Sequence, residues 1–290
     1  MKIAFVVPTV GRISPLRRLL ASLEGQLEKD DHIAIATVGD PDAIRALIKS
    51  FNFPEGCVSV CRSPWGISTA RNLAVESLPA VVDFLLFPND TSWYGGDFVR
   101  NFKMLNVTQT CGAIEAVDET GPKFVLPAAG TALTKANVWQ VVEPGLFMDH
   151  GVFRSLGGFN EDFGTGGPTP WQSGEGTELL LRWMAHGSGP SFRWITELTV
   201  HGVSDASGLS PSQRRRKLRA YGRGYGRLLI LGGFSLRKRL EAALGGWLFG
   251  VRKGAPYQAA DGLWVGLGRV EGLYGVALRG PRGTIRAVDQ

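Results

Sequence analysis

Cysteine is scarce in this sequence, and its positions exclude the functions that depend on cysteine clusters. The chain has three cysteines, Cys57, Cys61 and Cys111, and four histidines among 290 residues. Three cysteines do not build the disulfide framework of a small secreted domain. Cys57 and Cys61 have no second Cys or His pair at the spacing of a zinc site. We therefore expect three reduced thiols in a cytoplasmic protein.

Long apolar runs and the common phosphate-binding motifs are also missing. No uninterrupted apolar run reaches the roughly eighteen residues of a membrane-spanning helix, so none is expected. The apolar run at residues 3–8 is too short for a signal peptide, and no cleavage site follows it. The chain has no GxGxxG after its first expected strand and no GxxxxGK[ST]. A Rossmann dinucleotide site and a P-loop are therefore disfavoured.

Basic charge is present in excess, and it is concentrated in one part of the chain. Residues 204–290 hold 16 Lys and Arg against 5 Asp and Glu, whereas the whole chain has a net charge of +6. We expect two parts, a domain over 1–203 and a basic, amphipathic helical region over 204–290. A basic region of this kind can bind anionic lipid, a phosphate-bearing ligand or nucleic acid.

Strands and helices alternate through the first 90 residues. Short apolar runs predict strands over 2–8, 32–38, 57–61 and 81–87, with helices over 15–23, 43–51 and 70–76. Such alternation is typical of a parallel sheet with right-handed crossovers, which binds ligands beyond the carboxyl ends of its strands. Polar loops containing Thr9, Asp40 and Asp90 follow three of these strands. We therefore expect the three loops to converge on one edge of the sheet.

The next hundred residues add further strands and one notable loop. Strands are expected over 111–117, 123–126, 131–139 and 192–200, the last delivering His201 at its end. A loop rich in glycine and proline, 164–174, precedes an expected helix at 179–184. Ser173 or Thr177 can cap this helix, and acidic residues at its start, Glu175 and Glu178, are electrostatically favoured there. The loop is expected to be flexible enough to fold over a ligand.

Four blocks, in this order, resemble those of the family-2 glycosyltransferases. They are residues 6–9 (VVPT), 66–72 (GISTARN), 87–94 (FPNDTSWY), and 157–161 (GGFNE) followed by 174–182 (GEGTELLLR) and His201. The resemblance implies the GT-A fold, an α/β architecture with a Rossmann-like, mostly parallel sheet flanked by helices. It also implies transfer of a sugar, with inversion, from a nucleotide-diphosphate donor such as a UDP-sugar. The implied acceptor is a saccharide or lipid-linked saccharide, in cell-surface polysaccharide or glycolipid biosynthesis.

The resemblance also implies roles for individual residues. Those expected to contact the nucleotide sugar are Pro8, Thr9, Asp40, Gly66, Arg71, Asn89 and Asp90. Asp90 and His201 are expected to hold a divalent metal, Mn²⁺ or Mg²⁺, that neutralises the leaving diphosphate as a Lewis acid. Without the resemblance, plainer interpretations stand beside these: a turn residue for Asp90, a strand-end histidine for His201, a helix cap for Asp40 and a structural ion pair for Arg71.

Three positions depart from the family pattern. Asn89 and Thr91 stand where the family has acidic residues, so metal binding is expected to be weak, to lean on the substrate phosphates, or to be dispensable. Gly176 stands at the position of the family's usual general base. Glu175 is therefore the first candidate for the base that deprotonates the acceptor hydroxyl, Glu178 the second and Glu161 the third. These departures leave a non-catalytic sugar-nucleotide-binding or scaffold protein as the alternative function.

The basic C-terminal region predicts helices from Ser210 and over 236–251 and 263–278. Arginine on one side and Leu, Trp and Phe on the other are typical of a peripheral contact with an anionic membrane. We expect such a contact on the inner face of the membrane, where a lipid-linked acceptor would be presented. The alternative is a solvated charged face on helices that only pack on the core. Nucleic-acid binding is not expected, because no recognised module is present.

Overall fold

The computed structural model describes residues 1–186, 192–204, 208–253 and 257–278. These residues belong to two compact units. The first comprises 1–64, 69–158 and 179–204, and the second comprises 65–68, 159–178 and the residues from 205 onward. A division near residue 204 was expected. The difference is that the glycine-rich loop and residues 65–68 belong to the second unit.

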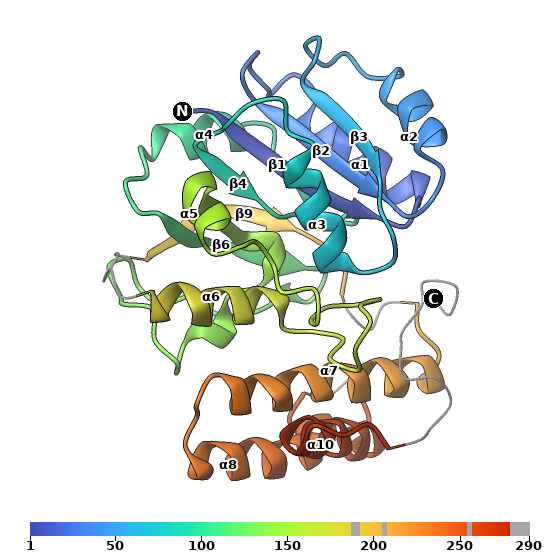
Figure 1. The fold of residues 1–290 in the computed structure, drawn as a ribbon, viewed down its shortest axis with the longest axis vertical. Helices are drawn as coiled ribbons and strands as arrows, with labels where there is room; N and C mark the ends of the chain where they lie inside the picture. The colour runs from blue at the N-terminus through green and yellow to red at the C-terminus, as the bar shows by residue number, and fades with distance from the viewer. Residues whose placement is uncertain (187–191, 205–207, 254–256, 279–290) are drawn as a thin grey trace. The chain divides into compact units, whose positions relative to one another are not determined.

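The first unit is built on one mixed sheet of nine strands among the described residues (Figure 1). The strands are β1 (Ile3–Thr9), β2 (His32–Thr37), β3 (Val58–Arg62), β4 (Phe84–Leu86), β5 (Trp93–Tyr94), β6 (Cys111–Asp118), β7 (Gly121–Pro122), β8 (Leu146–Asp149) and β9 (Arg193–His201). Their order is β3-β2-β1-β4-β8-β6-β9-β5, with β7 paired to β6. The first four strands in this order are parallel to one another. The expected α/β class is confirmed.

The parallel part of the sheet brings the ends of β1 and β2 to one edge. The two strands run in register from Ala4 opposite His32 to Thr9 opposite Thr37. Every residue of both strands is buried, which explains why they appear in the sequence as nearly continuous apolar runs. The edge at which both strands end therefore carries the loops that begin after Thr9 and Thr37.

Helices cover both faces of this sheet. They are α1 (Ile13–Leu23), α2 (Pro41–Ile48), α3 (Ile67–Glu76), α4 (Phe98–Met104) and α5 (His150–Ser155), and α6 (Glu175–Ala185) enters the unit at Leu179. Helices α1, α2 and α4 bury apolar side chains in the main core with Ile3, Phe5 and Val7 of β1. In Figure 1, α3 and α5 lie in front of the sheet. Phe153 of α5 packs on Phe87, with ring centroids 5.4 Å apart and the ring planes tilted by 34°.

Two expected strands are absent from the described residues. Residues 123–126 and 131–139 form loops and a 3-10 turn, Val138–Gln140, and a second 3-10 turn covers Glu143–Gly145. Val125 is 79% exposed, so this segment has no sheet face on which to bury its apolar side chains. The helix starts also differ from expectation, since α1 begins at Ile13 and α2 at Pro41. Asp40 caps α2, and its Oδ1 accepts from the Asp42 amide at 3.0 Å.

The second unit contains the four C-terminal helices (Figure 1). They are α7 (Pro211–Leu231), α8 (Leu236–Trp247), α9 (Phe249–Lys253) and α10 (Ala259–Tyr274). Ser210 and Gln213 form a capping box at the start of α7, and Ser235 caps α8. The expected helical C-terminal region is present, with its helix starts set by these serines.

Glycines set the distance between α7 and α10. A side-chain carbon at Gly226 would lie 2.2 Å from the Arg269 carbonyl oxygen, and one at Gly272 would lie 2.1 Å from the Arg223 carbonyl oxygen. A side-chain carbon at Gly268 would lie 2.1 Å from the Arg219 carbonyl oxygen, and one at Gly222 would lie 2.8 Å from the Val265 carbonyl oxygen, so each helix offers two glycines four residues apart. The two backbones therefore pack directly against each other, which only residues without a side chain permit.

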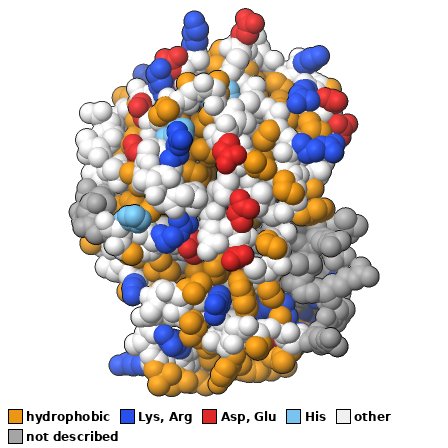
Figure 2. Space-filling model, viewed as in Figure 1, with side chains coloured by type: hydrophobic (Ala, Val, Ile, Leu, Met, Phe, Trp, Pro, Cys, Tyr) orange, Lys and Arg blue, Asp and Glu red, His pale blue; other side chains and the backbone are white. Residues whose placement is uncertain are grey.

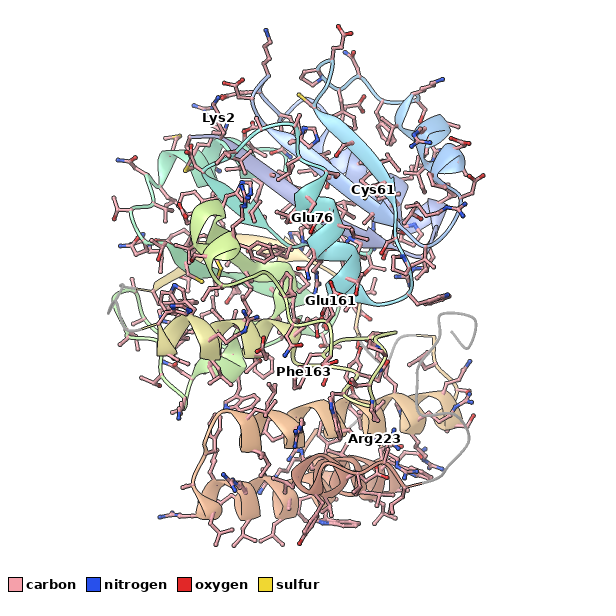
Figure 3. The ribbon with its side chains drawn as sticks, in the orientation of Figure 1. Lys2, Cys61, Glu76, Glu161, Phe163 and Arg223 are labelled. Carbon is pink, nitrogen blue, oxygen red and sulfur yellow. The ribbon has the colours of Figure 1, made fainter. Side chains whose placement is uncertain are left out.

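Two buried carboxylates on α10 anchor four arginines of α7. Asp261 is fully buried and accepts from the Nε atoms of Arg214 at 2.9 Å and Arg215 at 3.1 Å. Glu271 is 1% exposed and accepts from Arg219 and from Arg223 Nε at 2.6 Å; Figure 3 shows Arg223 on α7. These four side chains of the basic C-terminal region therefore hold α10, as the alternative of helices that pack on the protein predicts for them.

These ion pairs predict that the helical unit loses stability in acid. Burial alone would raise the pKa of Asp261 and Glu271, but hydrogen bonds outweigh it and hold each pKa below its ordinary value. These bonds come from the Gln258 backbone and two arginines for Asp261, and from Arg219 and Arg223 for Glu271. The unfolded chain therefore takes up these protons at a higher pH than the folded chain. Stability is expected to be fully present above about pH 4.5 and to fall as the pH drops further.

Circular dichroism melts between neutral and acidic pH, with hydrogen exchange on α10 peptides, measure this effect. Glu271→Gln should be less stable than wild type at neutral pH and should show a shallower decline in acid. If wild type and Glu271→Gln had parallel profiles, the decline would not come from Glu271, because other carboxyl groups would then take up the protons on unfolding.

Candidate functional site

A polar cluster lies where the parallel strands β1 and β4 end. Thr9 closes β1, and Asp90 follows β4 by four residues. Because β1 and β4 are neighbours, the two side chains meet: Thr9 Oγ1 donates to Asp90 Oδ2 at 2.7 Å. Thr9 is 4% exposed and Asp90 2%. The expected convergence of Thr9 and Asp90 is therefore present, and it places a carboxylate in a nearly dry site.

Arg12 supplies the positive charge beside this carboxylate. Its Nη2 atom lies 2.6 Å from Asp90 Oδ1, and its Nε atom lies 3.3 Å from Oδ2. The Arg12 side chain is 45% exposed, so the guanidinium spans from the buried carboxylate to the solvent. The sequence interpretation missed Arg12. A usable signal was its position, since it is the first charged residue of the loop that leaves β1.

A second arginine contacts the loop that follows β4. Arg71 of α3 is 1% exposed, and its Nη2 atom donates to Asn89 Oδ1 at 3.0 Å. The Asn89 backbone forms a tight turn with Ser92, because Asn89 N donates to Ser92 Oγ at 3.2 Å and Ser92 N to Asn89 O at 2.9 Å. Asn89, which stands in place of a carboxylate, therefore gives Arg71 a neutral hydrogen-bond acceptor in this turn.

The loops after β1 and β2 approach each other through two glycines. A side-chain carbon at Gly39 would lie 3.1 Å from Gly11 Cα, and Gly11 has a φ of +91°. The hydroxyls of Thr9 and Thr37 each accept from the amide two residues on, in Gly11 and Gly39. Asp40 follows directly and is exposed. It caps α2, so the plainer interpretation of Asp40 applies, while its outer oxygen faces solvent beside these loops.

His201 lies in a stack of three side chains. It ends β9 opposite Trp93 of β5, and the two rings stack at 5.5 Å with an angle of 15° between their planes. The Arg18 guanidinium covers Trp93 at 3.7 Å from the ring centroid, and Arg18 Nη2 donates to the Thr91 carbonyl at 3.2 Å. The expected strand-end position of His201 is thus confirmed, and its ring lies against an indole.

A divalent metal does not fit the residues that the resemblance assigned to it. Both oxygens of Asp90 accept hydrogen bonds from Arg12, and one of them also accepts from Thr9. Within the described ranges, no three His, Cys, Asp or Glu side chains come together to hold a metal ion. Hard cations need several oxygen ligands, and the guanidinium already neutralises the available carboxylate. The expected Mn²⁺ or Mg²⁺ stays a prediction without a ligand set.

Two of the sequence blocks, GISTARN and GGFNE, meet at Gly158. Gly158 has a φ of +74°, and a side-chain carbon there would lie 2.7 Å from Asn72 Oδ1. Asn72 is the last residue of the GISTARN block, and Gly158 belongs to GGFNE. Arg182 of α6 donates to the carbonyls of Leu156 and Gly158 and so fixes the same turn. These residues therefore hold the turn in place.

The glycine-rich loop of the second unit is fixed by one buried glutamine. Gln172 is fully buried, accepts from the Gly166 amide at 2.8 Å and donates to the carbonyls of Gly167 and Thr169. Ser68 Oγ donates to the Phe163 carbonyl at 2.6 Å, and Ile67 N to the Thr165 carbonyl at 3.0 Å. The loop is therefore hydrogen-bonded throughout, which differs from the expected flexible flap.

The two candidate bases begin α6 within this same unit. Glu175 is 6% exposed and Glu178 8%. A side-chain carbon at Gly164 would lie 3.3 Å from Glu175 Cδ, so the glycine loop packs directly on this carboxyl group. The Ser173 hydroxyl donates to the Tyr221 carbonyl at 2.9 Å, and Gly174 directly precedes the first residue of α6. Gly66 lies beside the loop with a φ of +126°, and Glu161 is exposed (Figure 3).

The thiols are unsuited to nucleophilic chemistry. Cys57, Cys61 and Cys111 are free, as the sequence predicts. Burial raises the pKa of each of the three thiols, which keeps them protonated at neutral pH. The cysteines therefore have no place in the candidate site.

Comparison with known proteins identifies the fold. No protein-family model matches the sequence, and no curated protein matches it. Residues 1–349 of TarS from S. aureus match with a TM-score of 0.56 at 11% identity, covering 96% of this chain and 93% of that chain. The mannosyltransferase PcManGT from Pyrobaculum calidifontis, solved with GDP-Man and Mn²⁺, matches with a TM-score of 0.58 at 12% identity, covering 94% and 87%.

GalNAc-T7, solved with UDP, GalNAc and Mn²⁺, is a further match. Its TM-score is 0.54 at 14% identity, over 85% of this chain and 51% of that chain. TarS has also been solved with UDP-GlcNAc and with UDP. At these identities the likeness establishes the fold. The chain has the mixed α/β fold of the GT-A glycosyltransferases, as the sequence blocks predict.

Proposed function

We propose that this protein is a glycosyltransferase that takes a sugar from a nucleoside-diphosphate donor, a UDP-sugar, and transfers it with inversion to a saccharide or lipid-linked saccharide. One observation carries the proposal: the cluster of buried Thr9 and Asp90 with the half-exposed Arg12 lies at the carboxyl edge of a GT-A sheet, where α/β sheets bind ligands. The complexes of TarS with UDP-GlcNAc and of PcManGT with GDP-Man support a nucleotide-sugar donor.

The donor contacts follow from the chemistry of the strand ends. Thr9, next to the buried Pro8, and the exposed outer oxygen of Asp40 contact the nucleoside, with Asp40 accepting from the uracil N–H. Arg12 and Arg71 face the diphosphate, because guanidinium groups bind phosphate oxygens in pairs. Asp90 and Asn89 hold these two arginines in place. Gly66, whose φ is +126°, lets the backbone come close to the donor.

The transfer needs one base and a stabilised leaving group. The acceptor hydroxyl oxygen attacks the anomeric carbon and its proton goes to the Glu175 carboxylate, with Glu178 as the second candidate. The bond from the anomeric carbon to the diphosphate oxygen breaks, and the oxygen keeps the electron pair. The guanidinium groups of Arg12 and Arg71 stabilise the added negative charge. No step depends on a metal ion.

The acceptor class places the reaction at a membrane. We propose a role in cell-surface polysaccharide or glycolipid biosynthesis, with the protein in the cytoplasm and bound peripherally to the inner membrane face. The exposed apolar side chains of the C-terminal helices support this location.

The alternative is a protein that binds a sugar nucleotide without chemistry. It is favoured by Gly176, where the resembling family has its base, and by the complete hydrogen bonding of the Asp90 carboxylate. Such a protein would bind the donor and release no UDP from it, whatever acceptor is offered.

Calorimetric titration of the full chain with UDP, uridine and UDP-GlcNAc tests the donor proposal. UDP is expected to bind at least about tenfold more tightly than uridine, because the diphosphate adds charge-assisted hydrogen bonds to two arginines. If uridine bound as tightly as UDP, the proposed contacts of the diphosphate with the two arginines would be wrong. No binding of any of the three, nor of GDP, would reject the function.

A further inference from the structure

Helix α8 has its large apolar side chains on the solvent side and its small residues against the protein. Leu236, Leu240 and Leu244 are 69%, 56% and 68% exposed, and their spacing of four residues aligns them along one face. Ala242 and Gly246 are the buried residues of this helix. A surface helix of a water-soluble protein normally buries its leucines. The arrangement of α8 is the reverse.

The exposed apolar surface continues beyond the end of α8. Trp247, Leu248 and Val251 are 42%, 49% and 69% exposed. We call the six residues together the leucine face: Leu236, Leu240, Leu244, Trp247, Leu248 and Val251. Figure 2 shows hydrophobic side chains gathered with Lys and Arg on the surface of the helical unit. Contiguous exposed apolar surface of this kind marks a site of interaction with a protein or a membrane.

Glycine packing explains why the leucines are not needed inside. A side-chain carbon at Gly246 would lie 2.8 Å from Gly266 Cα, and one at Gly262 would lie 2.2 Å from the Trp247 carbonyl oxygen. Helices α8 and α10 therefore touch backbone to backbone, through glycines that α10 places four residues apart. This is the packing that helices use where lipid, and not the protein core, takes up their large side chains.

The charges around the leucine face select the partner. Residues 236–253 contain five Lys and Arg and one Glu. The Arg237 side chain is 90% exposed and that of Lys238 44%, and both follow Leu236 in the sequence. Both pair with Glu241, at 2.9 Å and 3.9 Å, but these are exposed pairs that an anionic headgroup can replace, unlike the buried pairs of α7. Apolar side chains flanked by cations complement a lipid surface, in which acyl chains lie beneath anionic headgroups.

The length and composition of the helices determine their orientation relative to a lipid bilayer. Across 1–186, 192–204, 208–253 and 257–278, no helix has both the length and the apolar character needed to span a bilayer. A short helix with one apolar face lies in the plane of the interface instead. Trp247, at the end of α8, has the amphipathic ring that is enriched at the headgroup level.

We propose that the leucine face docks this protein on an anionic lipid bilayer. Helix α8 lies along the surface, its leucines enter the acyl boundary, and Arg237 and Lys238 contact the lipid phosphates. This identifies the surface for the peripheral contact proposed above, and it assigns that contact to α8 and not to α7. The α7 arginines 214, 215, 219 and 223 are already held by Asp261 and Glu271.

Vesicle flotation of the full chain tests the docking surface. Vesicles of phosphatidylcholine with about one third phosphatidylglycerol are compared with phosphatidylcholine alone. Wild type should float with the anionic vesicles and only weakly with the neutral ones. Leu240→Asp/Leu244→Asp should bind at least about tenfold more weakly, since two side chains are lost from the acyl boundary. Arg237→Glu/Lys238→Glu should lose the preference for anionic vesicles, by about fivefold for each charge removed.

A matched control separates this surface from general stickiness. Met104 and Val125 are 69% and 79% exposed on the first unit, so Met104→Asp/Val125→Asp removes equal apolar exposure elsewhere and should float like wild type. Because Leu240 and Leu244 are exposed, their variant should keep the wild-type circular dichroism spectrum. A blue shift of tryptophan emission on vesicle binding, reduced in Trp247→Phe, should report entry of the ring into the interface.

Three results would overturn the proposal. They are failure of wild type to float, equal flotation of wild type and Leu240→Asp/Leu244→Asp, and a wild-type dimer that this variant converts to a monomer while neither form floats. The third result would make the leucine face a contact between two copies. UDP titration of the same samples separates the proposals, because a chain that binds UDP but does not float rejects docking alone.

Discussion

Replacing Glu175 by glutamine is expected to lower sugar transfer by about 10²–10⁴-fold, the usual contribution of a general base. Glutamine keeps the size and the hydrogen-bonding reach of the side chain but accepts no proton at neutral pH. The carboxyl group is 6% exposed and packs on Gly164, so the isosteric change should leave the first turn of α6 intact. The affinity for the donor should change by less than about twofold, because the base acts on the acceptor.

Release of UDP from UDP-GlcNAc, with water or added saccharides as acceptor, provides the rate. Glu161→Gln is the matched control, because Glu161 is an exposed carboxylate of the same loop region and should keep wild-type turnover. If Glu178→Gln loses activity and Glu175→Gln does not, the base is Glu178. If neither variant changes a measurable wild-type rate, both assignments are wrong. A wild type that binds the donor but never releases UDP would support the non-catalytic alternative.

The sequence predicted the edge of the sheet well, because local patterns carry that information. Thr9 and Asp90 each follow a short apolar run, and parallel neighbours end at the same edge, so their meeting at 2.7 Å needed no tertiary knowledge. The hydrogen bonds that fix the glycine-rich loop were not predictable in the same way. Gln172 has no periodic or motif signal, and only the folded loop shows that it is fully buried and fixes the backbone.

The C-terminal region shows where charge patterns mislead. Arg214 and Arg223 belong to a dense basic run, but their partners Asp261 and Glu271 lie 47 and 48 residues further along the chain. A window over the basic run sees only cations and predicts a ligand. The glycines of α7 and α10 are the better signal, since their four-residue spacing on both helices predicts close backbone contact. Close contact requires that the arginines between them find partners on the facing helix.

Arg12 changes the expected chemistry of the site, because it lies where the resemblance predicts a metal ion. The resemblance predicts a metal at Asp90, whereas the structure places a guanidinium there, at 2.6 Å. If Arg12 provides the charge, UDP affinity of the wild type should be the same with Mn²⁺ and with a chelator. Arg12→Ala should bind UDP about ten- to a hundredfold more weakly, because one charge-assisted contact to the diphosphate is lost.

The same variant leaves Asp90 buried with Thr9 as its remaining partner. Breaking a fully buried pair costs about 3–5 kcal/mol, and the 45% exposure of the Arg12 side chain reduces this to about 1–2 kcal/mol, or several degrees in Tm.

Added Mn²⁺ should now bind the freed carboxylate and strengthen UDP binding in Arg12→Ala alone. Arg17→Ala, an exposed arginine of α1, is the control and should match wild type in both respects. Calorimetry with and without Mn²⁺ decides the question. A wild type whose UDP binding strengthens more than about tenfold with Mn²⁺, beside an Arg12→Ala that ignores the metal, would return Asp90 to the role of a metal ligand.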